Sequence, residues 1–124
     1  MSKVAAGDAL LQLFAGSETR NVRAGQTLFR EGDPGDAMYV IVEGDLEITI
    51  RGITMERVGP GGIVGEMALV DEAPRTATVS ALTDAKVIEV PTRTFETLVA
   101  QKPAFARHIV GVVGERLRRM NRYL

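Results

Sequence analysis

The sequence predicts a mainly β fold with flanking helices: a β-roll, or double-stranded jelly-roll, with a short N-terminal helix and two C-terminal helices. Between residues 20 and 91, short apolar runs alternate with glycines, as in short strands joined by tight turns. On either side, apolar residues recur every three or four positions, which is typical of amphipathic helices. The composition is 45% hydrophobic and 25% charged, as in a globular protein with one core. We therefore expect one domain over residues 1–124, with the roll at about 20–91 and the C-terminal helices at about 92–124.

The first expected element is a short helix near the N-terminus. Its apolar positions have modest helical spacing, and Gly16 is a residue that can end it. The apolar face would be formed by Ala6, Leu10, Leu11, Leu13 and Phe14.

Several strands of the roll are visible in the hydrophobic pattern. In residues 46–50, leucine and isoleucine alternate with glutamate and threonine, as in a strand with one buried face. Residues 39–42 are continuously apolar and indicate a more deeply buried strand. Residues 76–82 and 85–90 indicate two more strands, which are joined at residues 83–84.

After Pro91 the apolar period becomes helical again. Thr92 or Thr94 can cap a first short helix, which should end at Lys102. A longer helix is expected from about Pro103, because proline is favourable in a first helical turn. Its apolar stripe comprises Phe105, Ile109, Val112, Val113, Leu117, Met120 and Leu124.

Composition and charge exclude several classes of protein. The chain has no cysteine, which excludes disulfides, iron–sulfur clusters, thiolate zinc sites and cysteine nucleophiles. A net charge of −1 creates no strong field for DNA or an acidic membrane. His108 is the only histidine, and one histidine without partners builds neither a metal site nor a catalytic pair. Because no apolar run could span a membrane and no signal-peptide pattern begins the chain, we expect a cytoplasmic protein that is not an enzyme and has no cofactor.

The segment with the clearest chemistry is residues 65–79. Gly65 ends a glycine-rich loop and lets the backbone approach a ligand, and the amides of the helical run that follows would be free to bind an anion. Arg75 and the hydroxyl of Thr76 add the donors that a phosphate requires. Glu66 repels a phosphate but accepts hydrogen bonds from a sugar hydroxyl. One carboxylate beside one phosphate site predicts a ribose phosphate as the ligand.

This segment resembles the phosphate-binding cassette of the cyclic-nucleotide-binding domain family, which includes the catabolite activator protein, protein kinase A regulatory subunits and cyclic-nucleotide-gated channels. The family pattern is roughly Gly-Glu-x-Ala-Leu, a short turn, and Pro-Arg-Ser/Thr/Ala-Ala-Thr/Ser-Val. Here the two parts read Gly-Glu-Met-Ala-Leu at 65–69 and Pro-Arg-Thr-Ala-Thr-Val at 74–79. Residues 32–44 also resemble the family's strand–turn–strand entry, so that the resemblance covers about residues 25–90. It implies a β-roll that binds cAMP or cGMP.

The resemblance implies a role for each matched residue. Arg75 would pair with the cyclic phosphate, Thr76 would add its hydroxyl and amide, and Glu66 would bind the ribose 2′-hydroxyl. The family pattern often has an aromatic residue where this chain has Ile63-Val64, a departure that should alter packing under the loop more than phosphate binding. Further contacts to the sugar-phosphate, and apolar contacts, are implied for Gly65, Met67, Ala68, Ile48, Val64 and Val79.

By the same resemblance, the C-terminal helix would cover the base and transmit the bound state. Met120 and Tyr123, with Arg116 nearby, are the candidates to cover the base. We expect cAMP to be favoured over cGMP, because the compact chain is typical of bacterial modules. The hydroxyl of Thr76 would instead favour cGMP if it formed a hydrogen bond with the amino group of a syn guanine. The resemblance implies this contact, which cGMP-preferring members of the family make.

The sequence leaves alternatives open. The chain is either a regulatory module or the sensor half of a transcription factor of the catabolite-activator type; no helix-turn-helix fits after the long helix, so we expect no direct nucleic-acid binding by this chain. A roll that has lost its ligand is a third alternative, which the intact cassette opposes. Gly111 and Gly114 permit either close packing in a homodimer through the long helix or a hinge. The terminal arginines either complement the helix dipole or contact a phosphate or acidic partner: Arg116, Arg118, Arg119 and Arg122.

Overall fold

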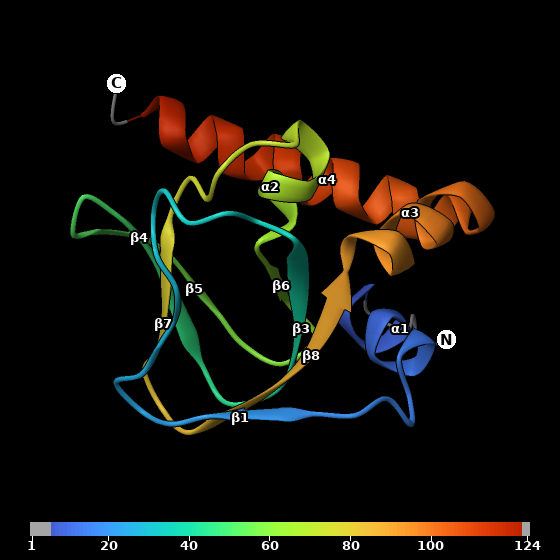
Figure 1. Cartoon of the computed structure of the whole chain (residues 1–124), viewed down its shortest axis with the longest axis horizontal. Coiled ribbons are helices and arrows are strands. Elements are labelled where there is room, and N and C mark those ends of the chain that lie inside the picture. Colours follow the sequence, from blue (N-terminus) through green and yellow to red (C-terminus); the bar gives the residue numbers. More distant parts are fainter. Residues whose placement is uncertain (1–5, 123–124) are drawn as a thin grey trace, which may run out of the picture.

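Two four-stranded antiparallel sheets face each other in the computed structural model, which describes residues 6–122 (Figure 1). The first has the strand order β1-β8-β3-β6 and the second β2-β7-β4-β5. The strands are β1 (Arg20–Val22), β2 (Thr27–Phe29), β3 (Ala37–Glu43), β4 (Leu46–Ile50), β5 (Ile53–Val58), β6 (Ile63–Val64), β7 (Thr78–Ala81) and β8 (Ala85–Pro91). The helices are α1 (Ala6–Leu13), α2 (Glu66–Asp71), α3 (Thr92–Gln101) and α4 (Pro103–Asn121). The predicted β-roll with one helix before it and two after it is confirmed.

The strand register brings distant parts of the chain to one end of the roll. On the second sheet, Phe29 of β2 lies opposite Val79 of β7, and Val79 lies opposite Ile48 of β4. On the first sheet, Val64 of the two-residue strand β6 pairs with Tyr39 of β3. Strand β6 leads directly into α2, so the chain leaves the edge of this sheet at the level where the second sheet presents Phe29 and Ile48.

Strand β3 is apolar on both faces because it lies between two hydrophobic clusters. Tyr39 and Ile41 point into the cluster enclosed by the two sheets. Met38 and Val40 point the other way, into a cluster formed with the helices. Successive side chains of a strand alternate between faces, so a strand covered on both sides has no polar positions to alternate with. This explains the continuous apolar run at residues 39–42.

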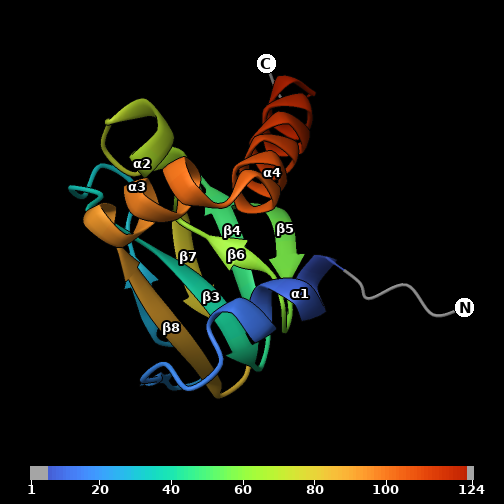
Figure 2. The same cartoon turned by 90° about the vertical axis from the view of Figure 1, so that its right-hand side faces the viewer.

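The helices α1, α3 and α4 cover the outer face of the first sheet. Phe105 of α4 lies between Phe14, which directly follows α1, and Phe95 of α3, with ring centroids 6.5 and 5.9 Å apart and both pairs edge to face. Such pairs add to the stabilisation that burial of the rings provides. From this anchor α4 runs across the end of the roll, where α2 also lies (Figures 1 and 2).

Two local predictions are wrong. No threonine caps α3, because its N-cap is Pro91 and the hydroxyl of Thr92 donates instead to the carbonyl oxygen of Asp36 at 2.9 Å. The strand predicted at residues 76–82 begins only at Thr78. The preceding backbone pairs with the β2–β3 turn, since the N–H of Arg75 donates to the carbonyl oxygen of Asp33 at 2.8 Å.

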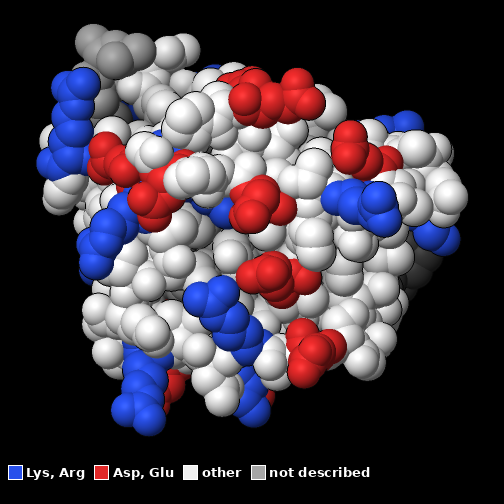
Figure 3. All heavy atoms as spheres, viewed as in Figure 1, with Lys and Arg blue, Asp and Glu red and all other residues white. Residues whose placement is uncertain are grey.

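Acidic and basic side chains are interspersed over the face shown in Figure 3, in agreement with the net charge of −1. Among residues 6–122, no helix has both the length and the apolar character needed to cross a membrane.

Candidate functional site

A glycine at the start of α2 forms one wall of the site. Gly65 has a φ of 84°, in the left-handed region that favours glycine. A Cβ atom here would lie 2.6 Å from Nη1 of Arg75 and 3.3 Å from the carbonyl oxygen of Ala37. A larger residue would displace the arginine, so both the backbone conformation and the packing require glycine at this position.

Arg75 is buried at the centre of the site, with 5% of its surface exposed. Its Nη1 donates to the carbonyl oxygen of Gly65 at 2.8 Å, and its Nη2 donates to that of Ala37 at 2.6 Å. The guanidinium carbon lies over the ring of Phe29, 4.0 Å from the centroid. The buried Nε–H has no hydrogen-bond partner, the one such side-chain atom among the described residues. Because buried donors are nearly always paired, this atom marks a place for an acceptor.

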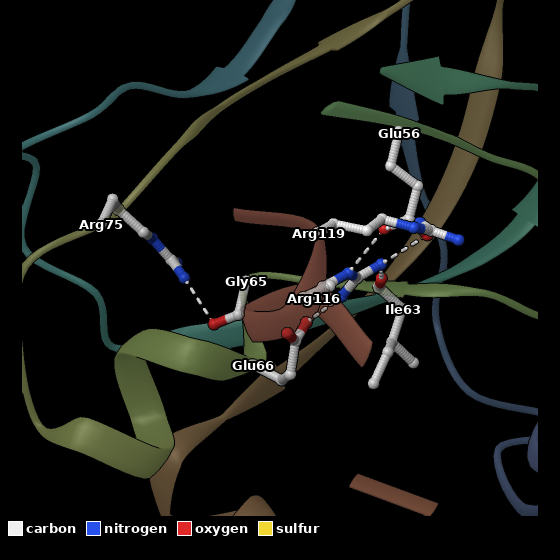
Figure 4. Close-up of polar contacts among 7 residues, drawn as sticks. All are labelled: Glu56, Ile63, Gly65, Glu66, Arg75, Arg116 and Arg119. Atoms are coloured by element: carbon white, nitrogen blue, oxygen red, sulfur yellow. Dashed lines mark hydrogen bonds and ion pairs between the residues drawn. The ribbon is translucent and has the colours of Figure 1, made fainter. Parts of the chain in front are cut away.

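A second arginine ties α4 to the site (Figure 4). Nη1 of Arg116 donates to Oε1 of Glu66, a carboxylate that is only 1% exposed. Its Nη2 donates to the carbonyl oxygen of Ile63 at 2.7 Å, and its Nε donates to Oε1 of Glu56 at 3.0 Å. Arg119 pairs with the same Glu56 oxygen at 2.8 Å. Helix α4 is therefore joined to the beginning of α2 and to strand β5 by a group of four charges that sum to zero.

The two buried arginines differ in charge balance. Burial lowers the pKa of the Arg116 guanidinium, but Glu66 and Glu56 raise it by more, and the net direction is upward. Burial also lowers the pKa of the Arg75 guanidinium, and the surrounding charges do not restore it. Since arginine stays protonated in proteins, Arg75 is a buried cation whose charge is incompletely balanced. It is the better placed of the two to receive an anion.

Two small cavities adjoin at this end of the roll, with volumes of about 40 and 30 Å³. Both are lined by Ile48, Met67, Thr76, Ala77 and Arg116. Pockets for small molecules usually enclose about 300–1,000 Å³. Each cavity is therefore much smaller than such a pocket in this structure.

Most of the residues predicted from the sequence line these cavities. Met120 lines the second cavity. Val64 does not line either one, because it is fully buried between the sheets. Tyr123 lies outside the described residues. The first cavity is lined by Gly65, Glu66, Met67, Ala68, Arg75, Thr76, Ile48, Val79 and Arg116.

Six residues that line the two cavities were not among the predicted ligand-binding residues: Phe29, Ile50, Met55, Glu56, Ala77 and Arg119. Phe29 lines the first cavity from β2, and Glu56 and Arg119 line the second. The hydrophobic pattern gave Phe29 no special status, because a partly buried aromatic residue in a strand is ordinary. Arg119 follows Arg116 by three positions, so both lie on one face of the helix. This spacing was the feature of the sequence that could have indicated Arg119 as a site residue. Within residues 6–122, no group of three His, Cys, Asp or Glu residues could hold a metal ion.

These features define a class of protein: a β-roll with a buried arginine aimed into a cavity beside a buried carboxylate, and a helix closing over both. The chain belongs to the cyclic nucleotide-binding domain family, whose model matches residues 19–102.

Similar proteins carry this domain in different contexts. A cGMP-dependent protein kinase, egl-4 of Caenorhabditis briggsae, is 32% identical over 106 residues, which are 86% of this chain and 14% of the kinase. A CRP-like cAMP-activated global transcriptional regulator of Mycobacterium tuberculosis is 30% identical over 105 residues, or 81% of this chain and 47% of the regulator. The crystal structure of the Thermus thermophilus catabolite activator protein is similar with a TM-score of 0.75 and 27% identity, over 94% of this chain and 55% of that one. The chain thus spans less than half the length of both the kinase and the regulator.

Proposed function

We propose that this chain is a regulatory module that binds a cyclic mononucleotide through residues 65–76, without catalysing a reaction, and that α4 transmits the bound state. The observation that carries the proposal is the unpaired Nε–H of Arg75, a buried donor on an incompletely balanced cation that lines a cavity. A phosphate supplies both the acceptor oxygen and the negative charge that this group lacks. The cytoplasmic location expected from the sequence belongs to this proposal.

The second part of the ligand is the ribose. Arg116 donates to Oε1 of Glu66, and within residues 6–122 no side chain donates to the other carboxylate oxygen. A ribose 2′-hydroxyl would donate to that oxygen, so that the ligand and α4 share one carboxylate. Binding of the ligand would then be coupled to the attachment of α4 to the site.

For the base we propose cAMP over cGMP. The similar kinase is named for cGMP and the similar regulator for cAMP, so these names support a cyclic nucleotide without choosing between the two bases. The exposed Thr76 lines both cavities, where its hydroxyl is available to either ligand. The preference for cAMP therefore stays a prediction.

A second candidate function is the sensor half of a transcription factor of the catabolite-activator type. It is favoured by the regulator from Mycobacterium tuberculosis, because the chain spans 47% of that protein. In that case the nucleotide would act through a DNA-binding part outside this sequence, and this chain by itself would not bind nucleic acid.

We also propose that two copies associate through α4. Val110 is 70% exposed and Leu117 is 46% exposed, and Val113 between them is partly buried. Their spacing of three and four residues forms one apolar strip, the spacing of the contact positions in coiled coils. A Cβ atom at the neighbouring Gly111 would meet nothing within 4 Å, so the side of α4 that carries this glycine is open to a second helix.

Calorimetric titration with cAMP and cGMP tests the main proposal, with the linear nucleotide 5′-AMP as a control for the cyclic phosphate. The intact chain should bind a cyclic nucleotide and bind 5′-AMP more weakly. Arg75→Ala removes the partner of a buried charge, at a cost of about 2–5 kcal/mol, so affinity should fall by roughly 30-fold to several thousand-fold. If Arg75→Ala binds as tightly as the parent chain, the phosphate site is wrongly assigned.

A further inference from the structure

Phe29 is the aromatic surface against which Arg75 rests. It lies at the end of β2, outside the segment 65–79, and the guanidinium carbon of Arg75 is 4.0 Å from its ring centroid. The ring of Phe29 also stacks on the buried ring of Tyr39, with centroids 6.1 Å apart and planes inclined by 26°. A cation over an aromatic face is attracted to it, and the attraction is strongest where water is excluded.

The remaining walls leave the guanidinium little freedom. A Cβ atom at Gly65 would lie 2.6 Å from Nη1 of Arg75 and 3.2 Å from Cε2 of Phe29, so this glycine is in close contact with both groups. A Cβ atom at Gly35 would lie 3.4 Å from Cδ and Cζ of Arg75. Two glycines and one ring therefore form a slot for the arginine.

The hydrogen bonds of Arg75 leave one direction unrestrained. The bonds to Gly65 and Ala37 use Nη1 and Nη2 and fix the position of the fork within its plane. Two hydrogen bonds at one end of the planar guanidinium still allow it to rotate about the line that joins the carbonyl oxygens of Gly65 and Ala37. Contact with the face of Phe29 restrains this rotation and so holds the orientation of the guanidinium beside the cavity.

We propose that Phe29 is a positioning residue for phosphate recognition: its ring orients the guanidinium of Arg75 before the ligand arrives. The inference rests on the proposed binding of a cyclic nucleotide and adds to it a residue from outside residues 65–79. It makes the aromatic face, rather than apolar volume, the property that matters at position 29.

Two substitutions separate the ring from its volume. Phe29→Met keeps an apolar side chain of similar length but removes the ring, and Phe29→Tyr keeps the ring. Phe29→Met should weaken the binding of cAMP and cGMP about 3- to 30-fold, the range expected for loss of a cation–π contact, and Phe29→Tyr should stay within about twofold of the parent. Phe14→Met is the control for loss of a buried ring, because Phe14 directly follows α1 and packs in the cluster between the helices and the first sheet; the affinity of this variant should be unchanged.

To test whether Phe29 acts through Arg75, the loss of affinity caused by Phe29→Met is measured in the parent chain and in an Arg75→Lys variant. Lysine keeps the charge but not the planar fork. The penalty of Phe29→Met should shrink in that background; an equal penalty in both would show that Phe29 contacts the ligand directly. In the ligand-free chain, ¹⁵N relaxation of the Arg75 side-chain Nε should show greater mobility in Phe29→Met and no change in Phe29→Tyr. Unchanged mobility and affinity in Phe29→Met would overturn the inference, whereas tight binding by Arg75→Ala would overturn the phosphate site itself.

Discussion

At the scale of single residues, the site depends on two buried arginines with different partners. Arg116 faces two carboxylates and a carbonyl oxygen, so its charge is balanced within the protein. Arg75 faces two carbonyl oxygens and a ring, and its Nε–H is unpaired. A buried ion needs compensation, from the protein or from a ligand. We therefore propose that Arg75, which has no carboxylate partner, recognises the ligand, and that Arg116 fixes the structure around it.

The ribose contact of Glu66 is tested with an analogue. Glu66→Gln keeps the shape of the side chain but replaces a charge-assisted hydrogen bond by a weaker neutral one. Affinity for cAMP should fall by about tenfold, and affinity for 2′-deoxy-cAMP should fall much less, because that ligand lacks the donor. Calorimetry with both ligands measures the difference. An equal loss for the two would mean that the substitution acts through Arg116 and the docking of α4, and not through the ribose.

At the scale of elements, α4 is held at both of its ends. Near its start, Phe105 is buried between the rings of Phe14 and Phe95. Near its end, Arg116 and Arg119 bind Glu56 of β5, and Arg116 also binds Glu66 of α2. The first attachment is apolar and includes none of the residues that we assign to the ligand. The second involves Glu66, the carboxylate that we assign to the ribose, and we therefore propose that the second half of α4 senses occupancy of the site.

We expect Glu56→Gln to loosen that second half. The substitution removes the charge that Arg116 and Arg119 share, while Glu66 and the apolar anchor remain. Amide hydrogen exchange should become faster in residues 112–121 and stay unchanged in residues 103–109, and the cyclic nucleotide should dissociate several-fold faster. Glu115→Gln, an exposed position on the same helix, is the matched control. Identical exchange in both variants would show that Glu56 does not hold the helix.

At the scale of the whole molecule, α4 has a role on each of its sides. One side carries Phe105, Ile109 and Arg116, which are buried against the roll. The other carries the exposed strip that includes Val110 and Leu117. A helix that closes one site while contacting a second copy would link ligand binding to association.

The proposed dimer has a direct test in solution. Light scattering at micromolar concentration should report twice the mass of one chain, and Leu117→Glu should reduce it to a single mass, because a charge cannot be buried in an apolar contact without a partner. Ile53→Glu, at a position that is 51% exposed but lies on the roll, should leave the mass unchanged. A single mass for the intact chain, with and without ligand, would exclude association through α4.

The sequence alone determined the roll, the helices around it and the core of the site. Short apolar runs between glycines are a local property of the chain, and so is the helical period on either side. The groups from Gly65 to Thr76 are also close in sequence, so their spacing along one loop was enough to predict a phosphate donor beside a sugar acceptor.

Tertiary structure alone decided which groups complete the site. Phe29 and Glu56 reach it through strand pairing, and a hydrophobic pattern shows which face a side chain occupies but not what it meets across the roll. The same limit applies to Arg116, whose place on α4 was predicted but whose carboxylate partners were not. It applies also to Val64, whose burial between the sheets depends on the partner of β6. Local periodicity specifies elements, whereas the pairing of charges and rings depends on distances between elements that only the folded chain fixes.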